Sequence, residues 1–350
     1  MQTRLPLVAC LLFACGGAPE AKDPTTTTEP TSRGVDSYAL LPGGAIGLGK
    51  LEVGALFRAG KAGETLGRLI SNYSPLGPES GFSLEHNVDR LICASYELHT
   101  ADVLCVAEGR FDAAKIDKAI LDLEDRAKAE RPGALPPVVR TPYAGRTLIT
   151  AANLGFVVFD ATHALAGTEN AMRRALDRTR DGATPRRDVR VEFQSRVVDS
   201  KADVAAAGTF EGAGFRALSF GPVKIRLLQG LREAYGEGRF SKRPVEPGSE
   251  STDSDVTLVT HLVYEEESKA EMSKNEVEGL LGFTKLGASL GVIPRLAHSK
   301  VEHKDKEAVV TAGFQDEVLA RWLERLPEVL NLPAPTRRGG VTGTVPGADK

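Results

Sequence analysis

Apolar and polar positions alternate with more than one period along this chain, which is typical of strands mixed with helices. Two apolar runs, 91–98 and 103–107, are separated by His99-Thr100-Ala101-Asp102 and predict a β-hairpin. The segment 256–264 alternates and is rich in β-branched residues, so it predicts a further strand. Two or three strands are expected within 143–165, one near 204–210, and a strand pair over 301–314.

Other stretches have apolar residues at spacings of three and four, which predict amphipathic helices. The clearest follows Asp112, a good N-cap, and carries the stripe Ile116, Ile120, Leu123 and Ala127. Another begins at about Thr168, and a capping box of Ser268 and Glu271 predicts a third that runs towards Leu290. Further helices are expected over 56–70, 191–200, 222–235 and 318–326.

This order of elements predicts an α+β fold, because strands come in hairpins and do not alternate regularly with helices. We expect two lobes, 36–183 and 188–330, each an antiparallel sheet packed with amphipathic helices. The boundary lies in a polar segment that contains Gly182 and Pro185. Residues 241–255 predict a mobile loop and 331–350 a disordered tail. Whether the lobes are a duplication stays open, because no residue-level repeat connects them.

The N-terminus has the pattern of a secretion signal. Arg4 precedes a mostly apolar run over 5–14, about half the roughly 20 residues that a membrane-spanning helix needs. Leu12-Phe13-Ala14-Cys15 resembles the lipobox of bacterial lipoproteins, whose signal is cleaved before a cysteine that is then acylated. The resemblance implies a signal peptide over 1–14, lipidation of Cys15 and a flexible linker over 15–35. An ordinary cleaved signal with an incidental cysteine is the alternative.

The resemblance also implies a location. An aspartate after the cysteine retains the better-known lipoproteins at the inner membrane, whereas Gly16 follows Cys15 here. This favours a cell-envelope protein of the outer membrane that faces the periplasm or the cell surface. The net charge of −3 and the pI of about 6.1 give no reason to expect nucleic acid. The expected partners are the membrane, through the lipid anchor, and other envelope proteins.

Two cysteines remain after Cys10 and Cys15 are assigned to the signal and the anchor. Side chains alternate along a strand, so a hairpin that turns about His99 would place Cys93 and Cys105 opposite each other on one face. An oxidising compartment would favour a disulfide between them. Two buried free thiols are the other interpretation.

The candidate motifs for chemistry are weak. The segment 44–50 matches the G-x-x-x-x-G-K part of a phosphate-binding loop, but Leu51 follows where that motif has Ser or Thr. We therefore predict a glycine-rich strand there. The six histidines are scattered, and common hydrolase signatures are absent from the sequence. No cofactor, metal or catalytic residue is predicted, although a triad could be assembled in space from scattered residues.

Arginines concentrate in one region and could bind phosphate groups through their planar forks. Acidic residues are interleaved with them, so a solvated helix face is the competing interpretation. The seven are Arg173, Arg174, Arg178, Arg180, Arg186, Arg187 and Arg190.

Taken together, these features predict a lipid-anchored envelope protein that acts by binding or scaffolding, and not as an enzyme. A solute-binding lipoprotein is an alternative, and it would need a cleft between the lobes with convergent polar groups. An envelope hydrolase is another, and it would need a nucleophile and a base within hydrogen-bond reach in such a cleft. An assembly factor would instead expose an apolar patch.

Overall fold

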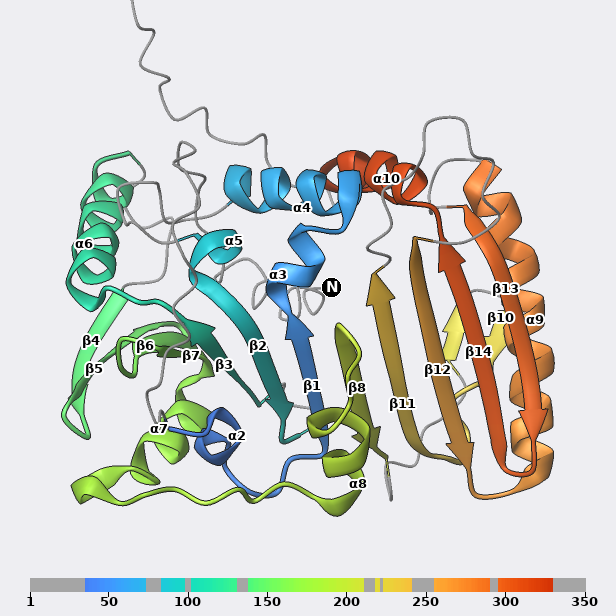
Figure 1. Ribbon diagram of the computed structural model, residues 1–350, viewed down its shortest axis with the longest axis horizontal. Coiled ribbons are helices and arrows are strands. Elements are labelled where there is room, and N and C mark those ends of the chain that lie inside the picture. The colour runs from blue at the N-terminus through green and yellow to red at the C-terminus, as the bar shows by residue number, and fades with distance from the viewer. Residues whose placement is uncertain are drawn as a thin grey trace, which may run out of the picture.

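The computed structural model describes residues 35–73, 83–97, 102–130, 138–210, 218–220, 223–240, 255–289 and 295–329. Its fold is α+β, as the sequence predicts. Twelve antiparallel strands form one sheet in the order β13-β14-β12-β11-β8-β1-β2-β3-β7-β6-β5-β4, and helices lie around it (Figure 1). The predicted signal peptide, linker, mobile loop and tail lie outside the described residues, apart from Val35 and Asp255.

The first half of the chain contributes one contiguous side of the sheet. Its strands are β1 (Gly47–Glu52), β2 (Val88–Ser95), β3 (Val103–Gly109), β4 (Val138–Tyr143), β5 (Arg146–Ala151), β6 (Leu154–Val158) and β7 (His163–Thr168). Its helices are α2 (Ser37–Leu40), α3 (Val53–Phe57), α4 (Gly60–Tyr73), α5 (Leu84–Asn87), α6 (Ala113–Glu130) and α7 (Glu169–Asp177), followed by the turn η2 (Arg180–Gly182).

The second half contributes the other side. Its strands in the large sheet are β8 (Val204–Thr209), β11 (Leu231–Phe240), β12 (Val256–Tyr264), β13 (Leu296–Lys304) and β14 (Glu307–Phe314). A separate hairpin pairs β9 (Leu218–Phe220) with β10 (Val223–Ile225). Its helical elements are α8 (Val191–Phe193), the π-helical turn η3 (Gln194–Val198), α9 (Glu267–Ser289) and α10 (Asp316–Val329).

The two predicted lobes share one sheet instead of having a sheet each. Their meeting point is the antiparallel pair of β1 and β8, in which Gly49 lies opposite Ala206 and Leu51 opposite Val204. The small side chains of this pair allow a continuous ladder of backbone hydrogen bonds. The polar segment at the predicted boundary connects η2 to α8 and has no regular structure.

The two halves have the same strand order outward from this central pair. The inner five strands of the first half read β1-β2-β3-β7-β6, beyond which lie β5 and β4, and the second half reads β8-β11-β12-β14-β13. In both halves a helix follows the third of these strands: α6 follows β3, and α9 follows β12. A second helix follows the fourth strand: α7 follows β7, and α10 follows β14. Because β1 and β8 are antiparallel, the halves are related by an approximate two-fold axis between them.

One face of the sheet, called the α7 face, carries the main core. Its residues include Leu48, Ala94 and Leu104, which lie side by side in the strand pairs. Helices α2, α7 and α8 cover them with apolar side chains that include Leu40, Leu176 and Phe193, all fully buried. Gly155 lets α7 approach closely, because a Cβ at that position would lie 2.5 Å from the Met172 side chain.

The opposite face, called the α6 face, is covered by different helices at its two ends. In the first half, α3, α5 and α6 pack on it through a cluster that includes Val53, Leu84 and Ile116. In the second half, Ala270 of α9 packs against Ala308. Between these ends the described strands carry small residues, and Ala206 is exposed.

A helix pair joins the halves along the ends of the central strands. α4 and α10 lie together at the top of Figure 1, with Ala62 packed against Ala320 and Leu323. The carboxylate of Asp316 accepts hydrogen bonds from the backbone N–H groups of Lys61 and Ala62 at 2.6 and 2.8 Å. Asp316 therefore caps the start of α4 from the other half of the chain.

Most predicted elements are confirmed, including the hairpin, the helices that follow Asp112 and Thr168, and the strand over 256–264. The helix predicted over 222–235 is wrong. That stretch forms β10, a turn and the start of β11, because β11 is needed to pair with both β8 and β12. At Gly236 of β11, a Cβ would lie 2.7 Å from the Val259 carbonyl oxygen.

The capping box predicted for the helix towards Leu290 also differs from the structure. The Glu266 carbonyl accepts the first helical hydrogen bonds, so α9 begins at Glu267 and Ser268 lies inside its first turn.

Candidate ligand-binding sites

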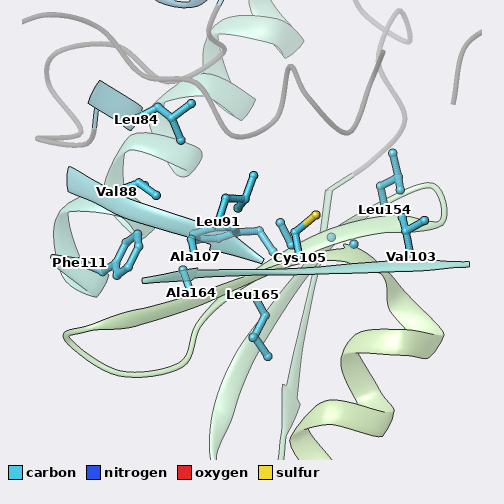
Figure 2. A pocket seen from close by; sticks show the side chains of 14 residues that line it. Leu84, Val88, Leu91, Val103, Cys105, Ala107, Phe111, Leu154, Ala164 and Leu165 are labelled. Atoms are coloured by element: carbon cyan, nitrogen blue, oxygen red, sulfur yellow. The ribbon is translucent and has the colours of Figure 1, made fainter. Parts of the chain in front are cut away.

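An apolar pocket lies on the α6 face of the first half (Figure 2). Leu91, Cys105 and Leu154 project from the same side of the strands, Leu84 of α5 lies above them, and Phe111 lies at one end. The cavity is about 50 Å³, several times the space that one water needs. No charged residue lines it. Its chemistry suits a hydrocarbon, because nothing in the wall offers a side-chain ion pair or hydrogen bond.

The wall of this pocket includes a disulfide. Cys93 and Cys105 face each other across β2 and β3 and are bonded, with their Cα atoms 4.0 Å apart. The bond joins the strands next to the centre of the sheet, so it fixes the floor of the pocket. The alternating pattern of the hairpin was the signal that indicated this pairing.

A serine from α2 lies beside a histidine and an aspartate that are three residues apart, at the α7 face. His163 Nε2 is 3.1 Å from the Ser37 Oγ, and His163 Nδ1 is 3.1 Å from Asp160 Oδ1. Burial would raise the pKa of Asp160, but hydrogen bonds from Thr162 outweigh it and hold that pKa below its usual value. The order of contacts is that of a catalytic triad. No local sequence motif indicates that Ser37 contacts His163.

Burial argues that this group is structural. Ser37 is 2% exposed and His163 is 6% exposed, so a substrate could not reach the hydroxyl in this conformation. Both ring nitrogens of His163 have partners, as expected of a buried histidine. The arrangement ties α2 to the start of β7.

A polar row continues from His163 across the same face. Cα partners in neighbouring strands run Glu108 beside His163, Arg90 beside Glu108, and Glu52 beside Arg90. Arg90 donates to Glu52 at 2.8 Å and to Glu108 at 3.2 Å. The ion pairs neutralise one another, which lets charged groups lie on a largely apolar face.

A polar cleft opens at the end of this row, where the two halves meet. Its cavity is about 510 Å³. The residues that line it come from α2, β1, β2 and the segment between η2 and β8: Tyr38, Lys50, Glu52, Arg90, Arg187, Val198, Asp199, Ser200, Lys201 and Ala202. Burial raises the pKa of Tyr38 to about 12 and lowers the pKa of Lys50.

The seven arginines do not form one converging patch. Four of them pair with carboxylates on different elements, Arg173 with Glu169, Arg174 with Asp102, Arg180 with Asp177 and Arg187 with Asp36. Arg178 donates to backbone carbonyls, and Arg190 donates to Thr209. Their guanidinium groups mostly hold the segment after β7 in place. Only Arg187 lines the polar cleft.

The other motifs have plain structural roles. The segment that resembles part of a phosphate-binding loop ends in β1, and Gly47–Lys50 form a strand, as predicted. Among the described residues, no group of three His, Cys, Asp or Glu side chains could hold a metal ion. Within that same part of the chain, no helix is long and apolar enough to cross a membrane. Cys15 lies outside it.

Comparisons with known proteins give no family. No protein-family model and no curated protein matches this sequence. Solved structures of a protein called TP0453 are similar: crystal form III has a TM-score of 0.46 at 9% identity, over 83% of this chain and 99% of that chain. Crystal form IV has a TM-score of 0.42 at 12% identity, over 82% and 96%. Likeness at this level does not define a function.

Proposed function

We propose that this chain is a lipid-anchored envelope protein that binds the end of an acyl chain without catalysing a reaction. The observation that carries the proposal is the apolar pocket on the α6 face, whose lining has no charged side chain. An anchor at Cys15 would hold that pocket near membrane lipids. Two or more acyl chains on one cysteine are enough for stable membrane attachment.

Fatty-acid binding tests the pocket. A fluorescent fatty acid such as cis-parinaric acid would be titrated into the unlipidated Cys15→Ala chain. We expect saturable binding that weakens at least tenfold in Ala107→Phe, because Ala107 lines the pocket and the larger ring fills it. Ala312→Phe, on the same face of β14 outside the pocket, is the matched control. Equal affinity in all three chains would place the fatty acid elsewhere and refute the pocket.

Intact mass spectrometry tests the anchor. The protein would be extracted from membranes of the source bacterium beside a Cys15→Ala variant. We expect a wild-type chain that begins at an acylated Cys15, and loss of acylation in the variant. Separation of inner and outer membranes by density would then test the outer-membrane location that Gly16 favours. A chain that retains Met1, or that is cut elsewhere without a lipid, would overturn the anchor.

The absence of catalysis is tested at Ser37. A fluorophosphonate probe labels activated serines, and we expect no labelling of Ser37 because the residue is buried. Ser37→Ala should instead lower the free energy of unfolding by about 1 kcal/mol, the usual cost of one lost hydrogen bond. Labelling that disappears in Ser37→Ala would support a hydrolase and contradict the proposal.

A further inference from the structure

The polar cleft between the halves contains a buried cation with unused hydrogen-bonding capacity. Lys50 is 7% exposed, and its ammonium group donates to the Ser200 carbonyl oxygen. Within the described residues, this is the only hydrogen bond that the Lys50 side chain forms, and it has no ion pair. An ammonium group has three donors, so two remain. Glu52, Glu237 and Asp199 lie near enough to act on the Lys50 charge, but none of them pairs with it directly. The two free donors therefore make this position a candidate for an anion.

The other cations of the cleft are already neutralised. Arg90 is held by Glu52 and Glu108, and Arg187 is held by both oxygens of Asp36. Lys201 lies on the exposed rim. The buried anion-binding capacity of the cleft therefore rests on Lys50.

A second donor lies at the same cleft. Tyr38 is 5% exposed, and its hydroxyl has no hydrogen-bond partner in the part of the chain that the structure describes. Its ring lies under the Arg187 guanidinium, 5.3 Å from it, so its position is fixed by packing. The buried free donors of the cleft are thus one ammonium group and one phenol.

The charges of the cleft select among anions. Phosphate groups are matched best by arginine forks, and both forks here are occupied. Glu52 and Asp199 also line the cleft and would repel a doubly charged ligand. A monoanion with one carboxylate is repelled less, because it carries half the charge. Its other polar groups could donate to Asp199, which accepts only from Gln194 within the described residues.

We infer that the cleft between the two halves binds a small monocarboxylate, whose oxygens accept hydrogen bonds from the Lys50 ammonium and the Tyr38 hydroxyl. This site is on the opposite face of the sheet from the apolar pocket. It does not depend on acyl-chain binding, and either site can fail its test without the other.

The rate at which Lys50 is acylated measures whether a carboxylate occupies this site. Full-length Cys15→Ala protein would be treated with a water-soluble acetylating ester, and the modification rates of Lys50 and Lys304 would be followed by peptide mass spectrometry. At constant ionic strength, we expect acetate or L-lactate to slow acylation of Lys50 at least fivefold. Lys304, which is exposed at the end of β13 outside the cleft, is the internal control and should not change. Inorganic phosphate should protect Lys50 much less.

Several outcomes would overturn the inference. Unchanged acylation of Lys50 in acetate and L-lactate, or an equal decrease at Lys304, would show that no carboxylate occupies the site. Failure of the ester to modify Lys50 at all would show that its amine cannot be reached from the cleft. Equal protection by phosphate would contradict the choice of carboxylate.

Variants separate binding from folding. Tyr38→Phe keeps the buried ring and removes only the hydroxyl, so we expect it to fold and to lose most of the protection at Lys50. Lys304→Gln, at an exposed lysine of β13 outside the cleft, should show the wild-type protection of Lys50. Lys50→Met should abolish the heat of acetate binding in calorimetry. Full protection in Tyr38→Phe would remove Tyr38 from the site.

Discussion

The two halves of the sheet have the same strand order but are covered differently. On the α7 face, β2 and β3 carry Ile92 and Leu104, and helix α7 buries them. The equivalent strands β11 and β12 carry Tyr235 and His261 on that face, stacked with ring centroids 4.4 Å apart. Both side chains are partly exposed and contact Glu307 at 2.8 and 2.7 Å.

This difference explains where the last helices pack. α7 follows β7 and has an apolar surface to cover, whereas the strands before α10 present polar groups on that face. α10 packs instead on α4 of the other half. Equivalent topology therefore sets the path of the chain, and the side chains on each face decide which surfaces are buried. Most of the deep core and the apolar pocket belong to the first half, whereas both halves line the polar cleft.

Core truncation should give the largest difference between the halves. Leu165 on β7 is fully buried, whereas Leu262 on β12 is partly buried. We expect Leu165→Ala to lower the free energy of unfolding by about 3 kcal/mol and Leu262→Ala by about 1 kcal/mol. Urea unfolding measures both. Equal losses would mean that the second half is packed as tightly as the first.

The disulfide occurs in the first half, and the equivalent strands β11 and β12 have no cysteines. Replacing both Cys93 and Cys105 by alanine should lower the free energy of unfolding by about 3 kcal/mol, because the bond closes a short loop in the unfolded chain. A reducing agent should destabilise the wild type and leave the double variant unchanged. A stability insensitive to reduction in both chains would contradict a structural role for the bond.

The packing of α4 on α10 should depend on the Asp316 cap more than on surface charge. Asp316→Ala removes two hydrogen bonds to the start of α4 and should cost about 1 to 2 kcal/mol. Glu317→Ala removes the ion pair with Lys61, in which both side chains are 66% exposed, and should cause no measurable change. Thermal unfolding of the two variants distinguishes these contributions. A larger loss of stability in Glu317→Ala than in Asp316→Ala would show that the ion pair holds the two helices together.

The smallest expected effect is the acid sensitivity of the link from α2 to β7. The pKa of Asp160 is lower in the folded protein than in the unfolded chain, because hydrogen bonds from Thr162 outweigh the effect of burial. Its contribution is present above the unfolded pKa of about 4 and is lost as the pH falls through the folded pKa. Asp160→Asn should flatten unfolding curves below pH 4. Asp181→Asn, at an exposed carboxylate, should leave them unchanged.

Local patterns were enough to predict elements whose neighbours are close in sequence. The hairpin of β2 and β3 follows from alternation around a short turn, and the helices after Asp112 and Thr168 follow from a cap and an apolar stripe. The helix predicted over 222–235 was wrong because Pro222 and scattered apolar residues suit a helix locally. Its strand partners are β8 and β12, which no local pattern could indicate.

The candidate sites depend on residues far apart in the chain. Ser37 contacts His163, which is 126 residues away in the sequence, and Lys50 contacts Ser200, which is 150 residues away. Each of these residues alone has an ordinary surrounding sequence, so a search for motifs could not find them. The arginine segment is the opposite case, because it has a local signal but forms no site. The number of arginines over 173–190 suggests a phosphate-binding patch, but their partners are distributed over several elements.

The sequence by itself determined the α+β class, most element boundaries and the shared face of Cys93 and Cys105, because these follow from periodicities of two and 3.6 residues. The tertiary structure decided that two lobes share one sheet, that the second half repeats the strand order of the first, and that Lys50 lies in a cleft. Those outcomes depend on which strand edges meet and which surfaces exclude water, and both are set by contacts between distant parts of the chain.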